Sequence, residues 1–252
     1  MSIKDHFSGV AQAYAAARPE YPAALFDAIA AHVPSHAHVW EPGCGSGQAT
    51  RDLAARFAHV HATDPSAQQL AQHWANDAAV DNVTLTVEPG EHTWMFDNSV
   101  DLVAVAQAMH WFDVPAFFAE CDRVLRPGGV LAAWGYDDFD VPVGMESAVA
   151  AFRAAIERDW PPERELVLRH YRDYDWPFEP LDVPPLQLAV DWNFDRLIGY
   201  MNSFSAVARH RERTGGDPVA RHRDVLRDAW GDPAAVRRIT WPLFLHLRRK
   251  PA

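Results

Sequence analysis

The chain has 252 residues, 48% of them hydrophobic, which is enough to form one large globular domain with a sizeable core over residues 1–252. Its formal net charge of −11 at pH 7 disfavours binding to a nucleic-acid backbone, so we expect a small-molecule substrate. Two cysteines, and no apolar run near the roughly 20 residues of a membrane span, predict a cytoplasmic protein without disulfides or membrane attachment.

The hydrophobic pattern alternates between helical and strand periods along the chain, as a doubly wound α/β fold requires. Apolar residues at helical spacing predict helices, whereas alternating or short continuous apolar runs predict strands. The predicted helices cover residues 22–33, 48–57, 67–79, 115–125, 195–208 and 218–230. The predicted strands cover residues 38–41, 60–63, 83–87, 100–106, 130–134, 186–192 and 238–247.

The stretch that follows the fifth predicted strand has a different character. It is rich in prolines and aromatic residues, as in Trp160-Pro161-Pro162 and Trp176-Pro177-Phe178, and it is too long for an ordinary connection. We expect residues 138–180 to form a small, mainly helical insertion over the carboxyl ends of the strands, where such folds bind ligands. This insertion is expected to decide the substrate.

The first predicted strand ends in a glycine turn. Glu41 closes the strand, glycines follow at positions 43, 45 and 47 with Cys44 between them, and Asp64 closes the second strand. Glycine tolerates positive φ and lets backbone approach a ligand closely. An acidic residue at the end of the next strand can accept hydrogen bonds from ribose hydroxyls. Together these residues predict a site for a cofactor of the adenosine type.

The spacing of the turn narrows the choice of cofactor. Gln48 stands where the dinucleotide fingerprint G-x-G-x-x-G needs glycine, so the turn argues against a nicotinamide cofactor. No lysine follows the turn, so it is not a P-loop. A carboxylate at Glu41 would repel a pyrophosphate but suits a cationic amino group. S-adenosylmethionine carries such a group and no phosphate, so it is the expected cofactor.

The order E-x-G-x-G-x-G followed by Asp64 closely resembles the first two motifs of class I S-adenosylmethionine-dependent methyltransferases. The run Asp97 to Val103 resembles the D-x-S-F-D-x-V run of the methyltransferase type 11 group, with Val100 in place of phenylalanine. The resemblance implies a Rossmann-like sheet of seven strands, mostly parallel with an antiparallel last strand, and helices on both faces. Pro242 in that last strand then needs a bulge or an unpaired position.

The resemblance extends to the N-terminal segment, where Phe7, Tyr14 and Arg18 match the pattern that precedes the first helix in this family. It implies that Arg18 binds the methionine carboxylate and that Tyr14 lies near the sulfonium. The alternative is that Tyr14 docks the segment and Arg18 pairs with a surface acid. The expected cofactor-binding residues are Tyr14, Arg18, Glu41, Gly43, Cys44, Gly45, Gly47, Asp64, Pro65, Glu91, His92 and Gln107.

The end of the predicted strand 100–106 carries the candidate catalytic residues, His110 and Trp111. This pair resembles trans-aconitate methyltransferase-like enzymes, and the resemblance implies that the Trp111 indole holds the carboxylate of the methyl acceptor. A carboxylate is already ionised at pH 7 and needs no base. If the acceptor is a phenol or another hydroxyl, His110 is the candidate base. The alternative for both residues is aromatic packing against the next helix, together with Phe112.

The predicted function is therefore O-methylation of a small carboxylate. Methylation of a phenol or other hydroxyl, a nicotinamide-dependent oxidoreductase and a cofactor-binding protein without catalysis stay open as alternatives. The histidines are scattered and predict no metal site. A monomer or a homodimer is expected.

Overall fold

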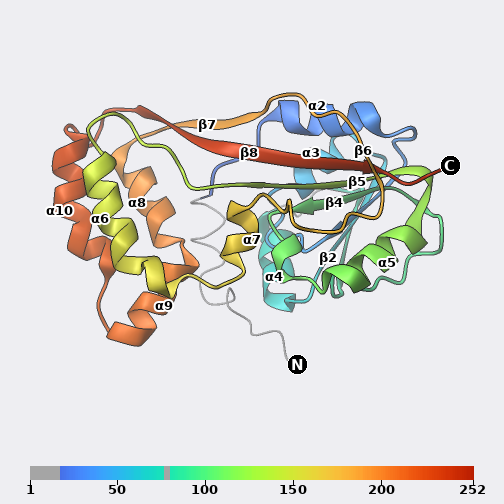
Figure 1. Cartoon of the computed structure of the whole chain (residues 1–252), viewed down its shortest axis with the longest axis horizontal. Helices are drawn as coiled ribbons and strands as arrows, with labels where there is room; N and C mark the ends of the chain where they lie inside the picture. The colour runs from blue at the N-terminus through green and yellow to red at the C-terminus, as the bar shows by residue number, and fades with distance from the viewer. Residues whose placement is uncertain (1–17, 77–79) are drawn as a thin grey trace. The chain divides into compact units, whose positions relative to one another are not determined.

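The computed structural model describes residues 18–76 and 80–252, and in it the chain forms two compact units (Figure 1). The larger unit comprises Glu20–Asp137, Glu165–Leu186 and Leu243–Ala252. The smaller unit comprises Asp138–Arg164 and Gln187–Pro242, together with Arg18 and Pro19 of the described residues. The expected insertion at residues 138–180 thus contributes to both units.

A mixed sheet forms the centre of the larger unit, with the strand order β3-β2-β1-β4-β5-β8-β6. Strands β1 to β5 are parallel, β8 runs antiparallel to β5, and the two-residue strand β6 pairs with β8. This confirms the predicted Rossmann-like fold. The strands are β1 (His38–Pro42), β2 (His59–Asp64), β3 (Val83–Val87), β4 (Val100–Ala106), β5 (Leu125–Tyr136), β6 (Glu179–Pro180) and β8 (Arg237–Arg249).

The helices of the larger unit lie around this sheet (Figure 1). They are α2 (Ala23–His32), α3 (Thr50–Ala54), α4 (Ala67–Asn76), the 3-10 turn η2 (Met109–Trp111), α5 (Val114–Val124) and α7 (Arg164–Leu168). Phe26 of α2 and Phe117 of α5 are fully buried, as are Trp40 of β1 and Trp134 of β5. The predicted helix 48–57 is shorter than expected because the glycine turn extends to residue 49.

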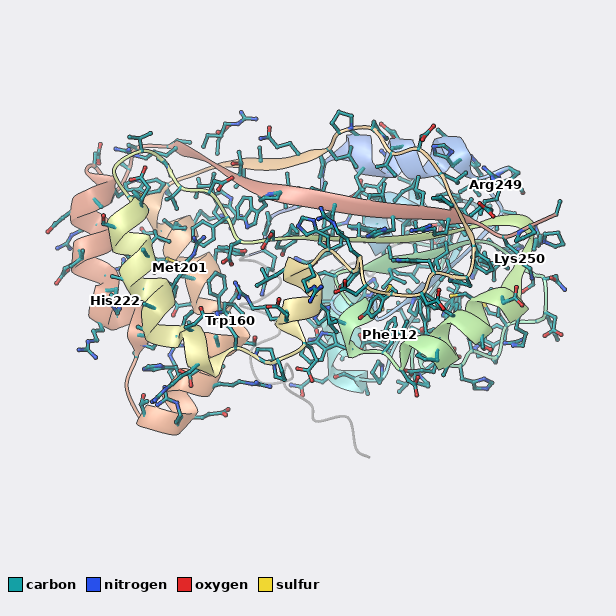
Figure 2. All side chains as sticks on the ribbon, viewed as in Figure 1. Phe112, Trp160, Met201, His222, Arg249 and Lys250 are labelled. Carbon is teal, nitrogen blue, oxygen red and sulfur yellow. The ribbon has the colours of Figure 1, made fainter. Side chains whose placement is uncertain are left out.

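The smaller unit is built from α6 (Glu146–Ile156), η3 (Glu157–Asp159), α8 (Phe194–Asn202), α9 (Ser205–Thr214), α10 (Pro218–Trp230) and strand β7 (Gln187–Trp192). The single helix predicted at 195–208 is wrong, because the chain breaks between α8 and α9. Phe204 has extended dihedrals there, and the Ser203 hydroxyl donates to the Tyr200 carbonyl at 2.7 Å. Tyr200 and Met201 of α8 are buried (Figure 2 labels Met201).

Strand β8 changes its partner at Pro242. Residues 237–242 pair with β7, ending at Gln187 opposite Pro242, and residues 243–249 pair with β5, starting at Tyr136 opposite Leu243. Proline has no N–H to donate to a ladder. Pro242 lies at the end of the β7 ladder, where the strand changes partner. This position explains why a proline is tolerated inside a 13-residue strand. Within the described residues, every helix is too short or too polar to cross a bilayer.

Candidate active site

The glycine turn after β1 is held in a conformation that glycine favours. Gly43, Gly45 and Gly47 have φ angles of +70°, +56° and +90°. The Cys44 amide donates to the Thr63 carbonyl of β2 at 3.0 Å, which fixes the turn to the neighbouring strand. A Cβ added at Gly45 would meet no atom within 4 Å, so the turn is open there. This opening lets a ligand approach the backbone.

Glu41 is a buried carboxyl group at the end of β1. Its side chain is 1% exposed, and neither oxygen has a hydrogen-bond partner within residues 18–76 and 80–252. Burial raises its pKa to about 8, an effect that Thr50 opposes and the charge on Asp64 assists. A buried carboxyl without a partner is costly in the free protein. A cationic group of a ligand would supply that partner.

Asp64 closes β2 and organises the turn. Its Oδ2 accepts the Gly45 amide at 3.0 Å, and its Oδ1 accepts the Ser66 amide at 2.8 Å. The predicted ribose-binding carboxylate therefore lies against the glycine turn, as the sequence spacing requires. Pro65, which follows it, is exposed.

One side chain that the sequence did not single out, that of His73, packs behind the turn. An added Cβ at Gly47 would lie 2.4 Å from the ring of His73, whose Nδ1 is 3.8 Å from the Cys44 Sγ. His73 and Cys44 are both buried, and burial raises the pKa of the Cys44 thiol well above its usual value. Cys44 therefore carries a protonated thiol that supports the turn.

Phe112 joins the glycine turn to the loop that follows β3. An added Cβ would lie 2.6 Å from the Phe112 ring at Gly90 and 3.1 Å from it at Gly43. The ring also packs on Phe117 of α5, with centroids 5.0 Å apart, and Figure 2 shows Phe112 near the start of that helix. Phe112 is thus the packing residue that the sequence predicted, and it packs against both predicted cofactor loops.

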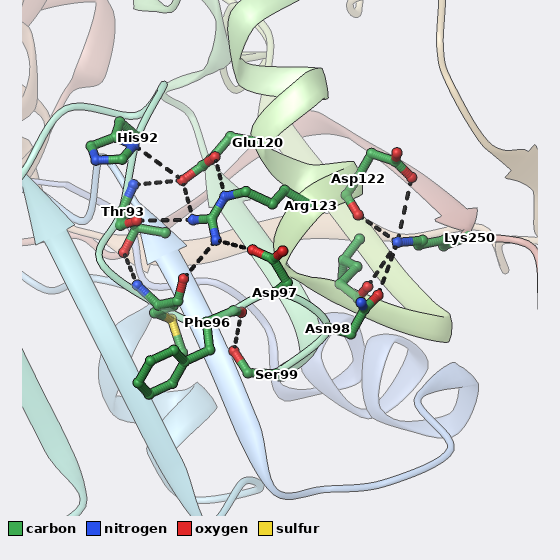
Figure 3. Close-up of polar contacts among 12 residues, drawn as sticks. His92, Thr93, Phe96, Asp97, Asn98, Ser99, Glu120, Asp122, Arg123 and Lys250 are labelled. Atoms are coloured by element: carbon green, nitrogen blue, oxygen red, sulfur yellow. Dashed lines mark hydrogen bonds and ion pairs between the residues drawn. The ribbon is translucent and has the colours of Figure 1, made fainter.

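Glu91 and His92 lie in the loop after β3. The Glu91 Oε1 accepts the Asp113 amide at 2.7 Å, which ties this loop to the start of α5. His92 is exposed, with its Nδ1 3.5 Å from the Glu120 Oε1. Glu120 also accepts the Thr93 amide at 2.7 Å and pairs with Arg123, as Figure 3 shows. The loop is therefore held on α5, and its binding to a ligand stays a prediction.

Gln107 lies just past β4 with φ at +53°. Its side-chain amide bonds the backbone of Tyr136, donating to the carbonyl at 3.1 Å and accepting the N–H at 3.1 Å. Gly135 leaves room for it, because an added Cβ would lie 2.2 Å from the Gln107 Oε1. The side chain therefore links β4 to β5, and cofactor binding by Gln107 stays a prediction.

His110 and Trp111 form part of η2, which begins two residues after Gln107. Their rings lie 4.7 Å apart, and Trp111 is 36% exposed. The His110 Nδ1 lies 2.8 Å from the hydroxyl of Tyr171, a fully buried residue of the segment 165–186. Burial lowers the pKa of His110 to about 3, so its imidazole is neutral at pH 7. No sequence pattern pairs Tyr171 with His110, because 61 residues separate them.

Arg18 belongs to the smaller unit, where its guanidinium lies over the Tyr200 ring at 5.5 Å. Tyr14 lies outside the described residues. The predicted roles of both residues toward a cofactor remain predictions. Among the residues that the structure describes, no cluster of histidine, cysteine and acidic side chains could hold a metal ion.

Comparison with known proteins agrees with this geometry. A family model described as a methyltransferase domain matches residues 40–133. A solved structure from Anaeromyxobacter dehalogenans, classed as a type II methyltransferase, is 42% identical, covers 93% of this chain and 99% of its own, and superposes with a TM-score of 0.85. The chain belongs to the class I S-adenosylmethionine-dependent methyltransferases. The open alternatives of a nicotinamide-dependent oxidoreductase and of a protein without catalysis are thereby set aside.

Two further relatives are methyltransferases by name. One from Dictyostelium discoideum is 29% identical to this methyltransferase over 98% of this chain and 95% of its own length. Another, from Mycobacterium bovis, is 37% identical over 52% of this chain and 53% of its own length. Neither name states an acceptor.

The residues present fit S-adenosylmethionine, the cofactor of this methyltransferase. The open face at Gly45 lets a ligand approach the backbone, and within residues 18–76 and 80–252 no side chain hydrogen-bonds the buried Glu41 carboxyl, so an ammonium group of a ligand can do so. Asp64 lies against the same turn. The cofactor would supply an electrophilic methyl group bonded to a sulfonium sulfur. After transfer of the methyl group, that sulfur would be a neutral thioether.

Proposed function

We propose that this methyltransferase transfers a methyl group to a carboxylate oxygen of a small molecule. The observation that carries the proposal is the state of His110. It is the histidine of η2, beside the predicted acceptor-binding tryptophan, and it is a poor base. An acceptor that needs no base therefore suits this site best.

The pKa values favour a carboxylate over a phenol as the acceptor. A phenol has a pKa of about 10, whereas burial holds the pKa of His110 to about 3. Moving the phenol proton to His110 would be uphill by on the order of 9 kcal/mol. A carboxylic acid has a pKa of about 4 and is ionised at pH 7. The proposed acceptor is thus nucleophilic before it enters the site.

The residues of η2 then serve to hold and orient the acceptor. The Trp111 indole N–H is a donor without any acceptor capacity, which suits an anionic oxygen. The displacement needs the acceptor oxygen, the methyl carbon and the leaving sulfur in line. Holding reacting atoms about 3–3.5 Å apart can lower the barrier by roughly 7–11 kcal/mol. Alignment and donor hydrogen bonds therefore account for the chemistry without a proton transfer.

Other residues hold the cofactor in this proposal. Glu41 pairs with the ammonium of the methionine end, Asp64 accepts the ribose hydroxyls, and the glycine turn lies between them. The loop with Glu91 and His92 contacts the adenine. We also propose a reducing, cytoplasmic setting and a monomer or homodimer without a nucleic-acid partner. The free thiols of Cys44 and Cys121 support the reducing setting. The net charge of −11 supports the absence of a nucleic-acid partner.

An acceptor panel tests the proposal. The full chain is incubated with S-adenosylmethionine labelled in the methyl group and with matched sets of carboxylic acids, phenols and amines. We expect label on the acids only, and a large loss of kcat/KM in Trp111→Phe. Trp94→Phe, at a surface tryptophan that is 59% exposed, is the matched control and should keep the wild-type rate. Turnover of phenols or amines in preference to acids would overturn the proposal.

A further inference from the structure

Tyr171 is held in one place by its surroundings. It is 1% exposed, its φ is +53°, and its amide donates to the Leu166 carbonyl at 3.0 Å. Its own carbonyl accepts the Trp176 indole at 3.3 Å. The ring stacks on Tyr174 at 5.6 Å and meets Phe244 edge-on at 5.2 Å. A bulky residue with positive φ is unusual, and these contacts offset its cost.

The hydroxyl of Tyr171 lies 2.8 Å from the Nδ1 of His110. A buried hydroxyl hydrogen needs an acceptor, and among the described residues Nδ1 is the side-chain atom within hydrogen-bond distance of this oxygen, so the O–H points to Nδ1. Burial keeps the phenol protonated by raising its pKa above the usual range, and it keeps the imidazole neutral.

The ring tautomer follows from this bond. In a neutral imidazole one nitrogen accepts and the other carries the proton, and the partner of the first nitrogen sets the choice. Because Nδ1 accepts from Tyr171, the proton of His110 lies on Nε2. The second nitrogen is then a hydrogen-bond donor and has no lone pair with which to act as a base.

We infer that Tyr171 is a positioning residue that fixes His110 as the Nε2–H tautomer, so that His110 donates a hydrogen bond to the methyl acceptor. The role of this bond toward the acceptor rests on the proposed carboxylate function. With Trp111, the turn η2 would present two N–H donors, which suit the two oxygens of a carboxylate. The same pair has no acceptor to offer an ammonium or a neutral amine, so it selects against them.

Nitrogen-15 NMR of histidine-labelled full chain tests the tautomer without any acceptor. His110→Gln assigns the resonances by difference. We expect wild-type Nδ1 to be unprotonated and shifted by an accepted hydrogen bond, and Nε2 to carry the proton. In Tyr171→Phe the Nδ1 resonance should move toward the value of an unbonded nitrogen. Tyr174→Phe, which removes a hydroxyl without a partner among the described residues, is the control and should leave both resonances in place.

Kinetics test the role toward the acceptor. Tyr171→Phe should raise KM for the best acid about tenfold, while KM for the cofactor stays within twofold; Tyr174→Phe should change neither. A protonated Nδ1 in the wild type, or an unchanged spectrum in Tyr171→Phe, would overturn the inference even if acids are the acceptors. An Nε2–H tautomer in an enzyme that methylates phenols would instead contradict the proposed function. The wild-type spectrum decides the tautomer if Tyr171→Phe fails to fold.

Discussion

Glu41 should release a proton when the cofactor binds. In the free protein its pKa is about 8, so about nine tenths of the carboxyl groups are protonated at pH 7. Pairing with an ammonium requires the ionised form, because a carboxylate beside an opposite charge has its pKa lowered. We therefore expect about 0.9 proton to be released for each ligand bound at pH 7.

The same linkage sets the pH dependence of affinity. Binding must include the ionisation of Glu41, which costs about 1.4 kcal/mol at pH 7 for a pKa of about 8. Affinity should therefore rise about ninefold from pH 6 to pH 7, a range in which the ligand amino group stays charged. Above about pH 9, where the free carboxyl is already ionised, the dependence of affinity on Glu41 ionisation should vanish.

Calorimetry measures both quantities. S-adenosylhomocysteine is titrated into the protein at pH 6 and pH 7 in buffers that differ in ionisation enthalpy, and the slope gives the number of protons released. Glu41→Gln should bind more weakly and release none. Asp64→Asn is the matched control, because it should weaken binding and still release most of a proton. Equal affinity at both pH values, or release that persists in Glu41→Gln, would refute the role of Glu41.

Two further predictions concern the free protein. The raised pKa of Glu41 means that this carboxyl binds a proton more tightly in the native state than in the unfolded state, so the contribution of Glu41 to the free energy of unfolding should fall as pH rises from 4.5 to about 8. Denaturant titration should show Glu41→Gln gaining up to about 5 kcal/mol over wild type at pH 9, compared with pH 4; equal pH profiles would contradict this. Gly90→Ala should lose about 1–3 kcal/mol by overpacking against Phe112, whose ring would lie 2.6 Å from the new methyl group. Phe112→Leu in the same chain should restore part of that stability, and a loss that is unchanged in the double variant would show that Phe112 is not the obstacle.

The parallel part of the fold was readable from the sequence because each strand there has a local signature. The continuous apolar run of Val100 to Ala106 corresponds to β4, which is buried along nearly its whole length. The turn at Gly43, Gly45 and Gly47 was equally local, since positive φ favours glycine at each position. Short-range patterns thus predicted β4 and the glycine turn.

The remaining features depend on contacts between distant residues. Tyr171 meets His110 across 61 residues, and no spacing rule could have joined them. The break between α8 and α9 comes from the extended dihedrals of Phe204, which helical periodicity does not reveal. Gln107 is bonded through its side-chain amide to the backbone of Tyr136 in β5, a contact that the sequence does not reveal. The contacts and conformations of these three residues depend on tertiary packing and not on local sequence propensity.

The chemical stability of the transferred methyl group tests the central claim most directly. Product formed by the wild-type chain from methyl-labelled cofactor is isolated and treated with mild alkali. A carboxylate methyl ester should release its label as methanol, and the parent acid should be recovered. A label that stays on the acceptor, as in a phenol ether or an N-methyl amine, would contradict methyl transfer to a carboxylate.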